Sequence, residues 1–397
     1  MSLQITKIRG IPIRLHFTLL ITFLLISWTI AVRFTPQIYP DLTSLEYWIT
    51  GITGAVVLFS SVVLHELAHS LLAMKYGLHV REIILFIFGG VSNIEDLDVT
   101  GERKGTVHDG ILADFRKEIR IALAGPITSF AIAAVLALIL FLLSRVSLQS
   151  DFALYKIVDV VLIYGTIVNI LLGIFNLIPA FPLDGGRILR ASILNWKKDF
   201  EKATKIAVRV GVIISYAFMG SGFIIMLLGD FFAGIWILLI GWFLNNGAQS
   251  YMSQYQLSSI LSRVHLRDIM NTNIIFVKDT FTIKETLSEY FNRHAKDSFP
   301  VLDDQRHLLG IVTFKDASNI LESSRDYVLV KDVMIPVTDL IIMQQNGAAD
   351  EALMKMARRP TRRIFVCDAE RKLVGIVSKT DIMNIATAKK EIMKNKK

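Results

Sequence analysis

Long apolar runs alternate with short polar segments over the first 250 residues of the chain and then stop. Runs of membrane-spanning length fall at 15–33, 47–74, 118–144, 153–178, 206–229 and 231–249. Because a helix needs about 20 apolar residues to cross the hydrocarbon core of a bilayer, the pattern predicts six transmembrane helices. The first run has no small-residue cleavage pattern behind it, so we expect it to remain as a membrane anchor.

The composition agrees with a membrane protein, and the charges predict its orientation. Hydrophobic residues make up 53% of the 397 residues, and the mean hydropathy is +0.50. Lys and Arg cluster before the first run, after the second and after the fourth, whereas the alternate loops hold few. Since basic loops stay in the cytoplasm, we predict a multi-pass protein of the cell membrane with both termini cytoplasmic. These flanking residues and the lipid bilayer account for the net charge of +8, so no nucleic-acid partner is predicted.

A short apolar stretch between the second and third runs predicts a different element. Ile83–Ile87 is too short to cross a bilayer and is followed closely by Gly89 and Gly90. We predict a short β-hairpin over Arg81–Gly90 that re-enters the membrane and is shielded by protein, because lipid cannot satisfy open backbone groups. A plain tight turn at the two glycines is the alternative.

From about residue 260 the apolar runs give way to an internal repeat. Residues 267–270 recur at 331–334, and residues 310–316 recur at 375–381, an offset of about 65 residues. Short β-branched runs alternate with amphipathic helices, and each copy predicts strand, helix, strand, strand and helix. The predicted fold is a polytopic α-helical membrane domain over residues 1–255, followed by two α/β repeats over residues 260–325 and 326–390.

The second apolar run carries the motif His65–Glu66–Leu67–Ala68–His69. Histidines four residues apart on a helix point the same way, so His65 and His69 can clasp one Zn²⁺. Glu66 lies roughly 100° around the helix, beside the metal but free to accept a proton from its water. An ordinary polar helix face is the alternative, but such residues at membrane depth must face the bundle interior.

A pair of histidines needs a third protein ligand, with one position left open for water. The only cysteine, Cys367, cannot form an internal disulfide or a cysteine-rich metal site, so a carboxylate is expected. Asp184 is the candidate, because Pro179 and Pro182 must break the fourth helix just before it. Alternatively, Asp184 only caps a helix that follows it.

Together these motifs resemble the site-2 protease family, the peptidase M50 group of intramembrane zinc metalloproteases. The similarity rests on the His65–Glu66–His69 motif, Gly125–Pro126 in the third run, and Asn176 with Pro182–Gly185 in the fourth. It implies one Zn²⁺ per chain held by His65, His69 and Asp184, with Glu66 activating water. It also implies that Asn176 holds the substrate or its developing oxyanion. The glycines Gly89 and Gly90 would offer a strand edge to an unwound transmembrane protein substrate.

The C-terminal repeats resemble a pair of cystathionine-β-synthase (CBS) domains. The similarity rests on the repeated Asp-x-Met openings and on a hydroxyl-x-x-carboxylate pattern after Gly-Ile-Val in each copy. It implies an adenine nucleotide contacted by four residues, Thr313, Asp316, Ser378 and Asp381. The alternative is that the pair only packs or dimerises, which leaves open a homodimer formed through the CBS domains.

The function predicted from the sequence is zinc-dependent intramembrane proteolysis modulated by nucleotide at the CBS pair. Two alternatives belong to other classes. In the first, the intramembrane His, Glu and Asp residues form the ion pathway of a CBS-regulated transporter. In the second, the chain is a non-catalytic membrane scaffold, although a scaffold would have no use for Glu66 beside both histidines.

Overall fold

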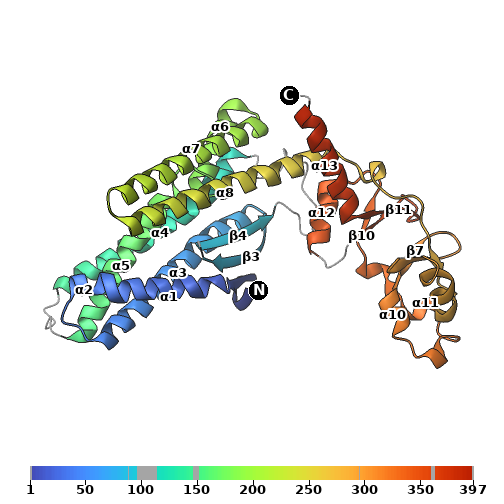
Figure 1. The fold of residues 1–397 in the computed structure, drawn as a ribbon, viewed down its shortest axis with the longest axis horizontal. Helices are drawn as coiled ribbons and strands as arrows, with labels where there is room; N and C mark the ends of the chain where they lie inside the picture. The colour runs from blue at the N-terminus through green and yellow to red at the C-terminus, as the bar shows by residue number, and fades with distance from the viewer. Residues whose placement is uncertain are drawn as a thin grey trace. The chain divides into compact units, whose positions relative to one another are not determined.

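The computed structural model describes residues 2–87, 89–95, 114–145, 152–294, 296–358 and 363–395. The chain divides into two compact units, Met1–Ser253 and Gln254–Lys397. The first unit holds the apolar helices and the second holds the repeats (Figure 1).

Six helical segments within the described residues are long and apolar enough to cross a membrane, as the sequence predicts. They are α1 to α2 (Thr18–Ile38), α3 (Ser44–Lys75), α4 (Phe115–Arg145), α5 (Ala153–Asn176), α7 (Phe200–Leu227) and α8 (Phe231–Leu261). The first is not uniform, because a π-helical turn, η1 (Ile30–Phe34), joins α1 (Thr18–Thr29) to α2 (Thr35–Ile38). A further amphipathic helix, α6 (Asp184–Lys197), follows the proline-rich segment.

A four-stranded sheet lies beside these helices. Its strands follow the order β1 (Ser2–Ile8), β2 (Ile11–His16), β3 (His79–Phe86) and β4 (Gly89–Glu95). The antiparallel pair β3–β4 contains the predicted hairpin, and Phe88 in its turn is outside the described residues. The sequence prediction missed β1 and β2, whose basic residues were interpreted only as a membrane flank. Strand β2 pairs with β3 in parallel across more than 60 residues of chain, a contact that no local pattern encodes.

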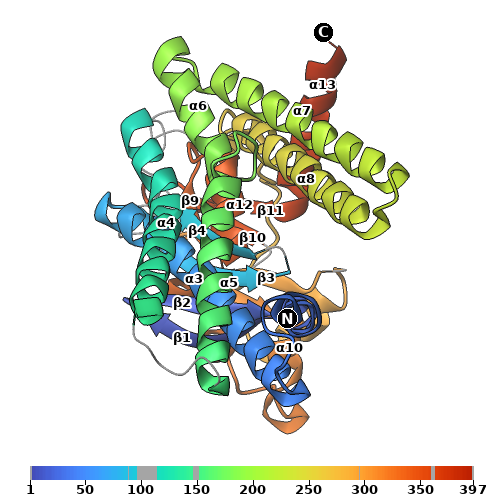
Figure 2. The ribbon, with the colours of Figure 1, turned by 90° about the vertical axis from the view of Figure 1, so that its left-hand side faces the viewer.

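Helix α3 occupies the centre of the first unit. It contacts α1, α4, α5 and both strands of the β3–β4 hairpin. A capping box starts it, in which the side chain of Thr43 accepts from the N–H of Glu46 and the Glu46 carboxylate accepts from the N–H of Thr43. Helices α7 and α8 form an antiparallel pair in both views (Figure 1, Figure 2).

The second unit contains two small mixed sheets, each followed by helices. The first sheet has the order β5 (Val277–Lys278), β6 (Ser298–Leu302), β7 (Leu308–Thr313) and β8 (Ile335–Pro336). The second has the order β11 (Leu373–Ser378), β10 (Arg363–Cys367) and β9 (Ile342–Gln344). The accompanying helices are α9 (Ile283–Glu285), η4 (Thr286–Phe291), α10 (Phe314–Ser318), α11 (Val330–Val333), α12 (Ala349–Arg358) and α13 (Lys379–Asn395). Each copy therefore has the predicted strand, helix, strand, strand, helix order.

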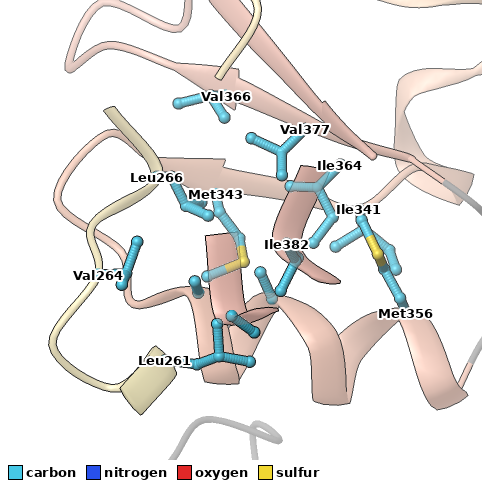
Figure 3. Packing of buried hydrophobic residues seen from close by; sticks show 13 residues of the cluster. Leu261, Val264, Leu266, Ile341, Met343, Met356, Ile364, Val366, Val377 and Ile382 are labelled. Carbon is cyan, nitrogen blue, oxygen red and sulfur yellow. The ribbon is translucent and has the colours of Figure 1, made fainter. Parts of the chain in front are cut away.

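The two repeats do not have separate hydrophobic cores, because each core includes residues of the other repeat. Leu261, Val264 and Leu266 lie at the start of the first repeat but are buried among residues 341–386 of the second (Figure 3). In the opposite direction, β8 lies near the start of the second repeat and pairs with β7 of the first. This exchange makes the unit depend on both copies, because neither core is complete without residues from the other.

The close approach of α7 and α8 depends on a glycine and is testable. A Cβ added to Gly222 would lie 2.7 Å from the carbonyl oxygen of Gly234 and 2.7 Å from the amide nitrogen of Leu238. We expect Gly222→Ala to destabilise the detergent-solubilised protein by about 1–3 kcal/mol, because backbone atoms must separate. Gly220→Ala, two residues away with nothing within 4 Å of its added Cβ, is the control and should not lower thermal stability. Equal melting temperatures for the two variants would contradict the packing argument.

Candidate functional site

His65 and His69 lie one turn apart on the buried face of α3. Their exposed fractions are 2% and 3%, and their ring centroids are 4.9 Å apart. The spacing of four residues puts both imidazoles on the side of α3 that faces α4, as the motif predicts. The two rings can therefore act at a single point.

Helix α4 orients both imidazoles through their Nδ1 atoms. The carbonyl oxygen of Ile121 lies 2.6 Å from Nδ1 of His69, and Oγ of Ser129 lies 2.9 Å from Nδ1 of His65. A carbonyl can only accept, so His69 donates from Nδ1 and its neutral ring presents the lone pair on Nε2. Such outer partners fix the ring orientation of metal-binding histidines.

Gly125 of α4 leaves the space in front of the two Nε2 atoms. A Cβ at this position would lie 2.5 Å from Nε2 of His65 and closer still to Nε2 of His69. Any side chain larger than hydrogen would therefore enter the space where a shared ligand of the two histidines must sit. The absence of a Cβ here is a requirement of the site rather than of the helix.

Asp184 completes the cluster from a third element. Its Oδ2 atom lies 3.2 Å from Nε2 of His65 and 3.0 Å from Nε2 of His69. The three ligand atoms lie within 4.8 Å of one another and all three residues are buried, which makes this a group able to hold a metal ion. Two imidazoles and one carboxylate are a donor set that suits zinc.

The segment before α6 brings Asp184 to the histidines. Helix α5 ends at Asn176, and the chain turns through residues 177–183 before α6 begins at Asp184 itself. A Cβ on Gly186 would lie 2.6 Å from the backbone nitrogen of Phe181, so only glycine lets the start of α6 pack on this turn. A carboxylate in the first turn of a helix is also stabilised by the helix dipole.

Glu66 is held by the β3–β4 hairpin. Its Oε2 atom accepts a hydrogen bond of 2.6 Å from the hydroxyl of Ser92. Gly90 lies against the same side chain, because a Cβ on Gly90 would be 2.5 Å from Cγ of Glu66. The sequence analysis did not identify Ser92. The sequence does contain a signal for Ser92: alternate residues of a strand lie on the same face, so Ser92 shares a face with Gly90.

The histidines, Asp184, Glu66 and Ser92 border one cavity of about 220 Å³. Both hairpin glycines and Asn176 line it as well, and so do Arg187 and Phe243, which were not among the site residues predicted from the sequence. The amide of Asn176 donates 2.9 Å to the carbonyl of Leu172 in its own helix. Arg187 lies 3.9 Å from Oδ1 of Asp184 and contributes the positive charge nearest to that carboxylate.

Strand β4 forms an edge of its sheet next to this cavity. Among the described strands, β4 pairs with β3 on one side and ends the order β1-β2-β3-β4. Gly89 has a φ of +127°, which favours glycine, and pairs with Phe86 at the end of the hairpin. The cavity therefore has metal ligands on one wall and an extended backbone on another.

A second cavity, of about 270 Å³, lies between the two repeats of the second unit. Ser378 and Asp381 line it together with Lys296 and Arg363, whereas Thr313 and Asp316 are not among its lining residues. In each copy the hydroxyl donates 2.6 Å to the carboxylate three residues later. The predicted nucleotide contacts thus divide into one pair at this cavity and one pair away from it.

Positive charge is concentrated at the wall of this second cavity. Arg363 lies 2.6 Å from Oδ1 of Asp297 and donates 2.5 Å to Oγ of Ser298. Partial burial acts to raise the pKa of the Asp297 carboxyl, but the charge of Arg363 and hydrogen bonds outweigh it and leave the pKa below its usual value. Lys296 adds a second cation, so the cavity suits an anionic group.

Comparisons with known proteins agree with this division of the chain. Residues 53–161 and 144–218 match peptidase family M50, and residues 266–323 and 330–387 match the CBS domain family. A zinc metalloprotease of Methanocaldococcus jannaschii is 32% identical over 98% of both chains. The candidate zinc metalloprotease Rip3 of Mycobacterium tuberculosis is 27% identical over 97% of this chain and 92% of its own. Among solved structures, a site-2 protease from M. jannaschii is 33% identical over 63% of this chain and 94% of its own, with a TM-score of 0.40.

The space at Gly125 provides a test of the metal centre. We expect Gly125→Ala to lower zinc affinity at least tenfold, because the added methyl group occupies the point at which the two Nε2 atoms converge. Zinc affinity would be measured by chelator competition on the purified protein. Gly220→Ala, also in an apolar helix but in open space, is the matched control. Retention of full zinc affinity by Gly125→Ala would show that the metal lies elsewhere.

Proposed function

Because this chain belongs to peptidase family M50, the site-2 protease family, and carries a C-terminal CBS domain pair, we propose that it is a zinc-dependent intramembrane endopeptidase. Its substrates are transmembrane segments of other proteins, and each chain holds one Zn²⁺ through His65, His69 and Asp184. The observation that carries the proposal is the convergence of three buried ligand atoms beside Glu66 in one cavity.

Each residue around the cavity has a separate role in the proposed peptide hydrolysis. Bound zinc would supply Lewis-acid chemistry and lower the pKa of water to about 7. Glu66 accepts a proton from the attacking water, whose oxygen bonds to the scissile carbonyl carbon, and delivers a proton to the leaving amine as the C–N bond breaks. Ser92 holds Oε2 of Glu66 in place for this transfer. Asn176 lies at the same cavity, where its amide can donate to the substrate carbonyl oxygen as negative charge develops.

The edge of β4 is the proposed substrate-binding surface. A transmembrane helix keeps its peptide bonds hydrogen-bonded and covered, so it must unwind before hydrolysis. An extended segment can then add to a free strand edge through main-chain hydrogen bonds. Gly89 and Gly90 lack side chains that would keep such a segment away from Glu66. The hairpin would thereby serve at membrane depth, as a re-entrant element inside the protein.

The distribution of charge supports an orientation with both termini in the cytoplasm. Six crossings place the ends on one side, and the basic segment after Asp184 includes Arg187, Arg190, Lys197 and Lys198. In this orientation the C-terminal end of α3 is on the cytoplasmic side, and His65 and His69 lie in its last three turns. The site would then open toward the cytoplasmic side of the bilayer.

The second cavity supports nucleotide regulation of the same enzyme. A phosphate group would be attracted by Lys296 and Arg363, and Ser378 and Asp381 would contact the ribose or phosphates. Such a ligand can change proteolysis only if it binds two conformations of the protein with different affinity. Adenine nucleotides are the class that we propose, and Thr313 with Asp316 is the equivalent pair of the first repeat.

Replacement of the general base separates catalysis from metal binding. We expect Glu66→Gln to abolish cleavage of a transmembrane substrate in proteoliposomes while about one zinc per chain remains bound, because a proton acceptor is lost but no ligand is. Asp184→Ala should lose zinc as well as activity. The other glutamate of α3 supplies a control, and Glu46→Gln should cleave normally. Undiminished turnover by Glu66→Gln would exclude the mechanism, whereas a wild-type protein without zinc would favour an ion pathway.

Nucleotide binding is tested on the full-length protein with matched hydroxyl and carboxylate variants. We expect calorimetry with AMP, ADP and ATP to give a submillimolar Kd for at least one of them, and the bound nucleotide to change the cleavage rate. Ser378→Ala/Asp381→Ala should weaken binding about tenfold or more, because two charge-assisted contacts are lost. Thr313→Ala/Asp316→Ala removes the same pair from the first repeat and should bind normally. Binding that is equally affected by both variants would not fit a single site at the second cavity.

A further inference from the structure

A buried ion pair joins two helices of the first unit close to the metal cluster. The guanidinium of Arg190 in α6 pairs with the carboxylate of Glu118 in α4, and their exposed fractions are 3% and 0%. Arg190 also donates to the hydroxyl of Tyr251 in α8. One side chain therefore links three helices, and neither the proposed chemistry nor the family motifs account for it.

Aromatic rings surround the guanidinium. The rings of Phe181, Phe200 and Tyr251 lie 5.6, 4.9 and 5.5 Å from its central carbon, within the range of cation–π attraction. Phe181 and Tyr251 also stack on each other, with centroids 4.2 Å apart and planes 13° from parallel. The surroundings of Arg190 thus fix its position as well as its charge.

Stability alone gives a poor account of this network. Oε2 of Glu118 and Nε of Arg190 are buried and have no hydrogen-bond partner. Removing two charges from water costs several kcal/mol per ion, and an incompletely satisfied pair seldom recovers that cost. Apolar residues of similar volume would pack in the same space, so the pair is better explained by what it holds in place.

Each partner of Arg190 adjoins a part of the metal cluster. Glu118 lies one helical turn before Ile121, whose carbonyl orients His69, and two turns before Gly125. Arg190 itself is in the second turn of α6, which starts at Asp184. The cluster depends on α4 for its imidazoles and on α6 for its carboxylate, and the ion pair ties these two helices together.

The link from α8 reaches the same carboxylate along a second route. Tyr251 stacks on Phe181, and a Cβ added to Gly247 of the same helix would lie 2.6 Å from Cδ of Pro182. Phe181 and Pro182 immediately precede Leu183 and Asp184. The turn that delivers Asp184 is thus in contact both with α8 and with Arg190.

We propose that Arg190, Glu118 and Tyr251 are positioning residues for the metal site. They fix α6 against α4 and α8, and so hold the Asp184 carboxylate at the two Nε2 atoms contributed by α3. The inference rests on the proposed zinc site, but it concerns the geometry of that site rather than the reaction. Such outer contacts are expected to change metal affinity by about 10–100-fold when removed.

The test removes the charge pair without leaving a buried charge. Arg190→Met/Glu118→Leu replaces both ions with apolar side chains, a change that commonly preserves stability. We expect the variant to keep a melting temperature within a few degrees of wild type while its zinc Kd, measured by chelator competition, rises about tenfold or more. The absorption spectrum of the Co²⁺-substituted protein should change with it, because the carboxylate no longer has a fixed place.

Two further variants keep the test decisive. Lys156→Met removes the cation of an ion pair between the buried Lys156 and the exposed Asp41. This pair is near the start of α5, about 30 Å along the helix from Asn176, so the variant should leave zinc affinity unchanged. Tyr251→Phe keeps the aromatic stack but loses the hydroxyl, and should weaken zinc binding in the same direction as the double variant. Should the double variant not fold, Tyr251→Phe decides the question.

The outcomes separate this inference from the proposed function. Zinc Kd and Co²⁺ spectra that match wild type in the folded double variant, or in Tyr251→Phe if only that protein folds, would show that the network serves packing alone. The proposed protease could still be correct in that case. A wild-type protein that binds no zinc would overturn the proposed function and the positioning role together.

Discussion

Two imidazoles and a carboxylate buried within a bundle of apolar helices need polar partners, because a buried polar group without a partner is costly. This requirement governs the first unit. His65 and His69 come from α3, their Nδ1 partners come from α4, and Asp184 comes from the start of α6. Three elements must therefore meet at one point before any of these side chains is stable at that depth.

The metal cluster and the proposed substrate surface are built on different kinds of scaffold. Helices carry the ligands, whose positions are fixed by turns of 3.6 residues and by close packing at Gly125. A β-hairpin carries the residues that hold Glu66 and border the cavity, and its outer strand has main-chain groups available for an extended peptide. Glu66 lies where the two scaffolds touch. The arrangement places the proposed proton acceptor between the candidate metal ligands and a strand edge, as the proposed peptide hydrolysis requires.

Small residues and buried charges set the distances in this unit. Glycines at Gly125 and Gly186 remove side chains where helix, turn and imidazole approach most closely. Whereas these glycines allow backbones to approach closely, the Arg190–Glu118 pair joins α6 to α4 through long polar side chains. In the second unit the repeats exchange strands and core residues, so a cavity with a cationic wall forms between two copies of one motif. Each unit thus places its cavity where elements distant in sequence meet.

The sequence by itself determined the six apolar helices, the repeated α/β copies and the family, because hydropathy, periodicity and the His-Glu-x-x-His spacing are local properties. It also identified His65, His69 and Asp184, which the structure brings within 4.8 Å. Only the tertiary structure decided that β2 pairs with β3, that Ser92 holds Glu66 and that Arg190 is buried against Glu118. It also decided that Ser378 rather than Thr313 lines the second cavity. These contacts join residues 26 to 72 positions apart or distinguish copies with the same local pattern. The energies of these contacts depend on which surfaces meet after folding, and local sequence patterns do not specify that.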